Sequence, residues 1–140
     1  MRIVTVDRKD RAPTVKYSDV NLRVSYAGKG TIVYDMDSIK QNILAILGTP
    51  IHTKWFRPEI GHRLDYFLFD PIDDKTASKI TDEIYRILSG PNSLEDRIRL
   101  TNVEVIPDTP NQNYYCNIVY VVPTLNDGLI EDNLELGLSQ

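Results

Sequence analysis

The chain contains very little cysteine and histidine. Its 140 residues include one cysteine, Cys116, and two histidines, His52 and His62. A single cysteine cannot form a disulfide within the chain, and Cys116 lies in the apolar stretch YYCNIVYVV, which predicts a buried side chain rather than an exposed nucleophile. The two histidines complete no known metal-binding spacing, so each is expected to be a hydrogen-bonding loop residue and no metal is expected.

Long apolar runs and an excess of basic charge are also missing. No stretch approaches the ~18 consecutive apolar residues that a transmembrane helix needs, and the start MRIVTVDRKDRAP becomes charged too early for a signal peptide. The formal net charge of -4 argues against free nucleic acid as a partner, because phosphate binding depends on clustered Lys and Arg. We therefore expect a protein of a reducing, cytoplasmic compartment that engages neither a membrane nor a nucleic acid.

The residues that are present fit one globular domain. Charged residues make up 26% of the chain and hydrophobic residues 41%, which is typical of a folded protein. We expect a single domain over residues 1–140, with an N-terminal arm at about 1–17 and a tail at about 124–140 whose structure depends on a partner. This tail mixes acids with five apolar residues, Leu129, Ile130, Leu134, Leu136 and Leu138.

Three helices are predicted, at about 35–47, 62–69 and 74–88. The first begins with Asp and Ser side chains that can cap it and ends before Gly48; the second ends before Pro71. The third has an apolar stripe at three- and four-residue steps. Its polar residues are expected to form exposed ion pairs worth only ~0.2–0.5 kcal/mol each. These residues are Lys79, Asp82, Glu83 and Arg86.

Two later segments, 101–107 and 114–123, read as strands joined by the turn-rich DTPNQN. The second is apolar at nearly every position, which is typical of a strand covered on both faces. A hairpin, or two extended pieces, is predicted around Ala27–Gly30, where GKG lacks the spacing and the following helix of a phosphate-binding loop. Together the elements predict an α+β fold, with about three helices packed on one face of a small, mainly antiparallel sheet.

Several carboxylates in and near turns leave glycoside hydrolysis open as an alternative. That chemistry needs two carboxyl groups held ~5–9.5 Å apart across a sugar-binding cleft, which sequence spacing cannot demonstrate. The acids that flank Pro71 precede a helix, where caps and favourable dipole charges are expected. The candidate acids are Glu59, Asp65, Asp70, Asp73, Asp74 and Glu95.

Two loops stand out as candidates for contact with a partner. In KWFRPEIGHRLDYFLFD, Gly61 is expected to need a positive φ angle or a close backbone approach, and Trp55 and Arg57 are predicted at a contact. The triplet Glu95-Asp96-Arg97 stands between a helix end and a strand. Its charges can form a salt bridge within their own fold or meet a partner, and the spacing alone leaves both possibilities open.

Five blocks, taken in order, resemble a known family. They are IKQNILAILGT, FRPEIGHRL, DDKTASKITDEIYRIL, EDRI and VEVIP, within about residues 38–122. The series resembles the baseplate wedge and sheath-initiator family of contractile phage tails, historically called a tail lysozyme. The baseplate subunit of type VI secretion systems is similar.

The resemblance implies where this chain meets its partners. Glu95 and Arg97 match a Glu-Pro-Arg signature of the family, whereas Asp96 stands where proline is usual, which leaves the rigidity of the loop in question. The family's loop meets the helical core bundle of the wedge proteins, and its sheet offers strands to the first sheath ring. We therefore predict that strand 115–122 lies beside an open edge and accepts a foreign strand. The predicted contact residues there are Val119, Tyr120 and Val121.

The resemblance also implies an architectural role without catalytic residues or a cofactor. The expected partners are wedge proteins and the tail sheath subunit, with tail tube and hub proteins as further candidates. Six copies, or a multiple of six, are expected around the tail axis of a virion assembled in the bacterial host cytoplasm. The alternatives are a peptidoglycan-cleaving muramidase of the tail and the homologous subunit of a type VI secretion system.

Overall fold

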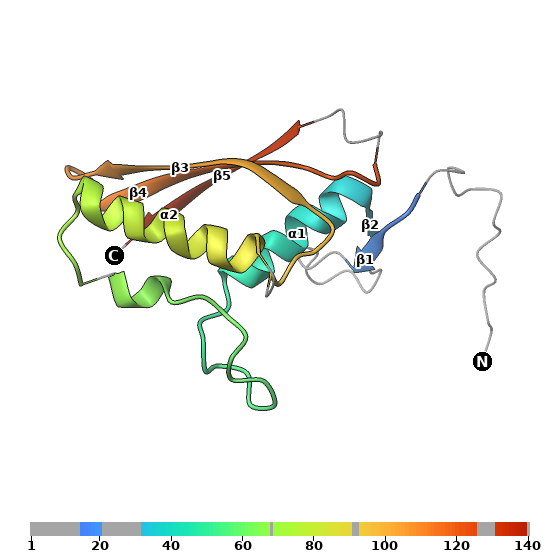
Figure 1. The fold of residues 1–140 in the computed structure, drawn as a ribbon, viewed down its shortest axis with the longest axis horizontal. Helices are drawn as coiled ribbons and strands as arrows, with labels where there is room; N and C mark the ends of the chain where they lie inside the picture. The colour runs from blue at the N-terminus through green and yellow to red at the C-terminus, as the bar shows by residue number, and fades with distance from the viewer. Residues whose placement is uncertain (1–14, 21–31, 68, 91–92, 126–130, 140) are drawn as a thin grey trace, which may run out of the picture.

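Two helices cover one face of a three-stranded sheet (Figure 1). In this computed structural model the described residues are 15–20, 32–67, 69–90, 93–125 and 131–139. The helices are α1 (Asp35–Leu47) and α2 (Asp74–Leu88), and the sheet consists of β3 (Arg99–Asp108), β4 (Asn113–Val121) and β5 (Glu131–Ser139). Both neighbouring pairs of strands are antiparallel. The predicted α+β class with a mainly antiparallel sheet is confirmed.

Strand β4 lies in the middle of the sheet, which corrects the prediction of an open edge. It pairs with β3 on one side and with β5 on the other. The backbones of Val119, Tyr120 and Val121 are therefore used within the chain and cannot accept a foreign strand. The two outer edges of this three-stranded sheet belong to β3 and β5.

Most of the segment predicted to be a partner-dependent tail forms strand β5. Residues 131–139 pair with β4 over nine consecutive positions, from Val121↔Glu131 to Asn113↔Ser139. Leu134 is 5% exposed and belongs to the core, with Leu136 and Leu138 packed against it. Alternating leucines in a strand turn to one face, so this segment buries its apolar side without a partner.

The helices follow the prediction except in the middle of the chain. The segment expected to be helical at about 62–69 forms only a 3-10 helix, η2 (Leu64–Phe67). Between Gly61 and Pro71 there are too few residues for a stable α-helix, because a short helix cannot offset the entropy of its first turn. The chain thus has two α-helices and one short 3-10 helix among the described residues.

The N-terminal described segment forms a small antiparallel pair, β1 (Ser18–Val20) and β2 (Ile32–Tyr34). The predicted turn at Ala27–Gly30 and most of the predicted arm lie outside the described residues. The expected cap of α1 by Asp35 is not formed: the N-cap residue is Tyr34, and no side chain caps the helix. Asp35 Oδ1 instead accepts hydrogen bonds from the backbone N–H groups of Lys16, at 2.9 Å, and Tyr17, at 3.0 Å.

The core lies between the helices and the inner face of β4. Its Cys116 is 2% exposed, and burial raises the pKa of this thiol to about 12, so the predicted small hydrophobe is confirmed. Neither described helix has the length and apolar character to cross a bilayer. The largest fully buried side chains are Ile39, Ile43, Ile84, Ile87, Leu88, Tyr114, Ile118 and Tyr120.

Candidate interaction sites

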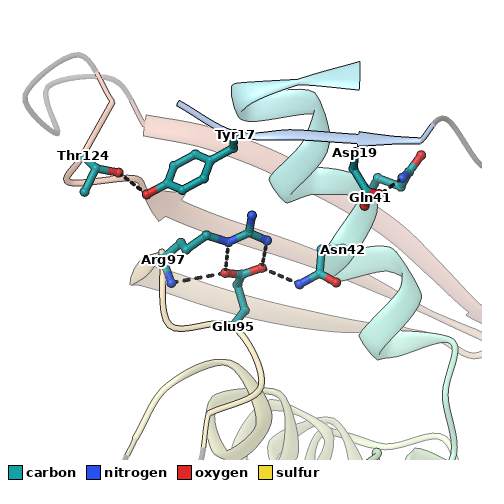
Figure 2. Close-up of polar contacts among 7 residues, drawn as sticks. All are labelled: Tyr17, Asp19, Gln41, Asn42, Glu95, Arg97 and Thr124. Atoms are coloured by element: carbon teal, nitrogen blue, oxygen red, sulfur yellow. Dashed lines mark hydrogen bonds and ion pairs between the residues drawn. The ribbon is translucent and has the colours of Figure 1, made fainter. Parts of the chain in front are cut away.

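The Glu95 carboxylate is the centre of a buried polar cluster (Figure 2). Arg97 donates to it from Nε at 2.7 Å, from Nη2 at 2.6 Å and from its backbone N–H at 3.2 Å. Asn42 of α1 donates from Nδ2 at 2.5 Å. The Glu95 side chain is 1% exposed, whereas that of Arg97 is 27% exposed. Both carboxylate oxygens are therefore fully used inside the fold.

The cluster holds its two charged groups in their ionised forms. Burial alone would raise the pKa of Glu95, but the hydrogen bonds from Arg97 and Asn42 outweigh burial and leave that pKa below its usual value. The hydrogen bond to Glu95 likewise raises the pKa of Arg97. The two directions agree, as expected for a bidentate ion pair.

The other side of Arg97 is covered by the N-terminal segment. Its guanidinium lies 5.1 Å from the centre of the Tyr17 ring, a distance at which a cation is attracted to the ring face. The Tyr17 hydroxyl is 2.7 Å from Thr124 Oγ1 (Figure 2). Gln41 of α1 donates to the Val20 carbonyl at 2.8 Å. The cluster thus joins the N-terminal segment, α1 and the residues that flank the sheet.

The three predicted contact residues, Glu95, Asp96 and Arg97, differ in how accessible they are to a partner. Glu95 does not fit a direct contact with a partner, because its carboxylate is buried and occupied. The interpretation as a salt bridge within the fold accounts for Glu95 and most of Arg97. Asp96 is exposed on the turn between them and is the member of the triplet that a partner can reach.

A second candidate site is the loop of residues 53–59, here termed the aromatic loop. The backbone closes its base, because His62 N–H donates to the Thr49 carbonyl at 3.0 Å and Ile51 N–H donates to the His62 carbonyl at 2.8 Å. Gly61 at this base has φ +140°, and a Cβ there would lie 2.7 Å from backbone atoms of Pro50 and Ile51. Both expectations for Gly61, a positive φ and a close backbone approach, are confirmed.

The aromatic loop presents its rings to solvent. Trp55 is 91% exposed and Phe56 95% exposed, and their ring centroids are 6.0 Å apart in a stacked arrangement. Arg57 Nε lies 3.9 Å from Glu59 Oε1, and both side chains are largely exposed. Adjacent exposed rings of this kind mark surfaces that other proteins cover. Trp55 and Arg57 are accessible, and their contact with a partner stays a prediction.

The polar face of α2 is partly buried, which corrects the expectation that its ion pairs are all exposed. The Glu83 side chain is 8% exposed and accepts from Arg86 Nη2 at 2.5 Å and from Arg63 N–H at 2.8 Å. Burial would raise the pKa of Glu83, but these hydrogen bonds leave it lowered. Arg86 also donates to the Gly61 carbonyl at 3.1 Å. Glu83 and Arg86 therefore fasten the aromatic loop to α2.

The histidines and the candidate acids are either exposed or engaged in interactions within the fold. His62 is 5% exposed and its Nδ1 accepts from Leu64 N–H at 3.1 Å, whereas His52 is exposed. Burial lowers the pKa of His62, which favours the neutral ring. Asp73 caps α2 by accepting from Thr76 N–H at 2.8 Å.

Other acids are exposed or engaged in ion pairs. Asp65 and Asp74 are exposed, the latter in the first turn of α2. Asp70 pairs with Lys79 at 2.8 Å. In the part of the chain that the structure describes, no group of three or more His, Cys, Asp or Glu side chains could hold a metal ion.

Three solved structures resemble this chain. A protein of Geobacter sulfurreducens that is proposed to be a tail lysozyme is 26% identical, with a TM-score of 0.61 over 74% of this chain and 90% of that one. Two baseplate structures share the fold. The R2 pyocin baseplate after contraction matches at 23% identity and TM-score 0.52, over 89% of this chain and 99% of that one. The baseplate of the anti-feeding prophage matches at 14% identity and TM-score 0.57, over 87% and 84%. The chain thus shares its fold with these three proteins.

The family follows from the sequence. The family model of baseplate wedge protein gp25 matches residues 34–126, which include α1, α2, β3 and β4. The chain therefore belongs to the baseplate wedge protein gp25 family, as the ordered sequence blocks predicted. Comparison with curated proteins finds no match.

Proposed function

We propose that this chain is a structural component of a contractile baseplate that joins wedge subunits to the first ring of the sheath and templates sheath polymerisation. The observation that carries the proposal is the buried Glu95–Arg97 pair, which holds exposed Asp96 on a fixed turn beside α1. A subunit that passes force between two partners needs such preorganised contacts, because ordering a loop on binding lowers affinity. Catalysis has no part in this role.

The wedge side of the proposal is the turn at Asp96, and the aromatic loop is a separate contact surface. The resemblance to the family's Glu-Pro-Arg signature assigns the turn to the helical core bundle of the wedge. In this chain the hydrogen bonds to Glu95 take the place of the usual proline in fixing the turn. Asp96 then supplies the contact, and Trp55 and Arg57 supply a second contact surface within the baseplate.

The sheath side of the proposal is the free edge of β5. The β3 edge carries Pro107 and has an irregular register between Leu100 and Asn102, and both features hinder pairing with another strand. Strand β5 is regular over nine positions and contains no proline. An added strand gains main-chain hydrogen bonds at such an edge, so β5 is the place for a sheath strand in a particle assembled in the host cytoplasm.

Reversing the charge at Asp96 tests the wedge contact. We expect Asp96→Lys to abolish co-purification with the tagged wedge proteins encoded beside this chain, because a like charge at a docked contact weakens binding. Asp96→Pro, which restores the family's usual residue but removes the carboxylate, should keep the turn and bind less tightly than the wild type but more tightly than Asp96→Lys. Asp82→Lys on the exposed side of α2 is the matched control and should also bind.

Stability must be measured alongside these binding experiments. All three variants should melt close to the wild-type temperature, since both positions are exposed. If a folded Asp96→Lys variant still entered wedges at the wild-type level, the assignment of this turn to the wedge would be wrong.

A further inference from the structure

The face of the sheet that the helices leave bare carries a hollow. Glu104, Asn117 and Glu135 lie side by side across β3, β4 and β5 in the strand register. Both glutamates are exposed, whereas Asn117 Oδ1 is buried and has no hydrogen-bond partner among the described residues. A cavity of about 510 Å³ opens here, with Tyr115 and Gly137 in its lining. Its size falls in the range of sites that take up a ligand or a side chain, about 300–1,000 Å³.

The residues around the hollow define the chemistry of its occupant. A Cβ at Gly137 would have no atom within 4 Å, so the glycine leaves open space in the middle of a strand. Tyr115 is 51% exposed and Ile106 52% exposed, and both contribute apolar rim. An unpartnered acceptor flanked by two carboxylates favours hydrogen-bond donors and cations. The hollow therefore suits an apolar side chain with basic neighbours.

The bare face also explains the composition of β4. Its outward residues include Val119 and Val121, which are only partly buried in the single chain. The apolar run predicted a strand covered on both faces, yet the helices cover one face only (Figure 1). The described residues leave the second face of β4 without a covering element, so something else must cover it if the pattern is to be satisfied.

The aromatic loop has the complementary chemistry. Trp55 and Phe56 are exposed beyond 90% and are flanked in sequence by the exposed cations Lys54 and Arg57. The loop projects on the helix side of the molecule, opposite the bare face of the sheet (Figure 1). One copy therefore cannot place its own loop in its own hollow.

We propose that the aromatic loop of one copy docks into the hollow on the bare sheet face of a neighbouring copy. Trp55 and Phe56 fill the space above Gly137, while Lys54 and Arg57 lie near the Glu104 and Glu135 carboxylates of the neighbour. The two surfaces differ, so the contact is head-to-tail and yields a ring where the rotation closes. This inference goes beyond the proposed function, because it names a neighbouring copy as the partner of the aromatic loop.

Complementary variants provide the test, with association measured by sedimentation velocity across a wide range of concentration. The wild-type chain should associate in a concentration-dependent manner. Trp55→Ala with Phe56→Ala removes the loop contact. Gly137→Val projects a side chain into the hollow from a position where a Cβ has no atom within 4 Å. Each variant alone should lose association by about tenfold to a hundredfold, as at interface hot spots. Mixed together, they should form dimers and nothing larger, since each retains one intact surface.

A charge exchange tests the polar part of the contact. Glu104→Lys with Glu135→Lys should weaken association, and mixing with a Lys54→Glu, Arg57→Glu copy should restore it. Asp82→Lys, on the exposed side of α2, serves as the control and should associate like the wild type. A wild-type chain that stays monomeric up to its solubility limit would overturn the proposal. So would dimers that persist in the Gly137→Val variant.

The proposed wedge contact and the proposed contact between copies can be tested independently. Asp96→Lys should associate with other copies like the wild type, because Asp96 lies on neither of these two surfaces. Gly137→Val should still co-purify with single wedge subunits through the turn at Asp96. Loss of self-association without loss of wedge binding would support the neighbouring-copy contact, and equal loss of both in Gly137→Val would contradict it.

Discussion

Replacing Glu95 with alanine is expected to lower the free energy of unfolding by about 3 kcal/mol, the range seen when one partner of a buried ion pair is removed. The variant loses four hydrogen bonds and leaves Arg97 and Asn42 without their shared acceptor. Urea unfolding at neutral pH measures the loss. Glu59→Ala is the matched control, because Glu59 is 69% exposed in a long ion pair and should change stability little.

The pH dependence adds a second check on Glu95. The hydrogen bonds overcome burial and hold the pKa of Glu95 below its usual 4.5 in the folded state. A carboxylate with a lowered folded-state pKa stabilises the fold above its unfolded pKa, and this contribution is lost as the pH falls through the folded value. The stability difference between wild type and Glu95→Ala should thus be constant near neutral pH and shrink below pH 4.5. A difference that grows on acidification would contradict the ionised cluster.

Gly61→Ala is the second substitution with a large expected effect, a loss of about 3 kcal/mol or more from backbone strain and steric overlap. The residue has φ +140°, and the new Cβ would lie 2.7 Å from Ile51 N and from the Pro50 carbonyl. These are backbone atoms, so no side-chain rotation relieves the overlap. The Gly61 carbonyl would also shift away from Arg86, which donates to it.

A matched glycine elsewhere separates strain from a general effect of losing glycine. Gly137→Ala places a Cβ in open space within β5, so its stability should stay equal or rise by about 0.5 kcal/mol. Thermal unfolding of both variants provides the comparison. Similar destabilisation by the two substitutions would refute the assignment of strain to Gly61.

The sequence predicted those elements whose periodicity is strong and whose ends carry boundary residues. Helix α2 has both, with an Asp cap at its start and Gly90 beyond its end, and its predicted bounds match the structure. Strands β3 and β4 were also placed within two residues. The strand β5 was missed, although Leu134, Leu136 and Leu138 alternate as a half-buried strand requires. The mixture of acids and apolar residues over 124–140 instead predicted a tail whose structure depends on a partner.

The candidate sites were harder to predict because burial of a charge depends on distant residues. In the sequence, Glu83 and Glu95 cannot be distinguished from exposed acids. In the fold, Glu83 accepts hydrogen bonds from Arg86 and Arg63. Glu95 accepts hydrogen bonds from Arg97 and Asn42. No local pattern predicts that Asn42 lies beside Glu95, fifty-three positions along the chain. The exposure of the Phe56 ring was not predicted, since a hydrophobic side chain is ordinarily assigned to the core, whereas Trp55 was predicted at a contact.

The central claim is that this chain joins wedge subunits to the first sheath ring. Electron cryomicroscopy of the assembled particle tests that claim most directly. We predict density for this chain at the junction, with Asp96 against a wedge subunit and a sheath strand paired along β5. A chain remote from the sheath, or a β5 edge left unpaired in the complete particle, would contradict it.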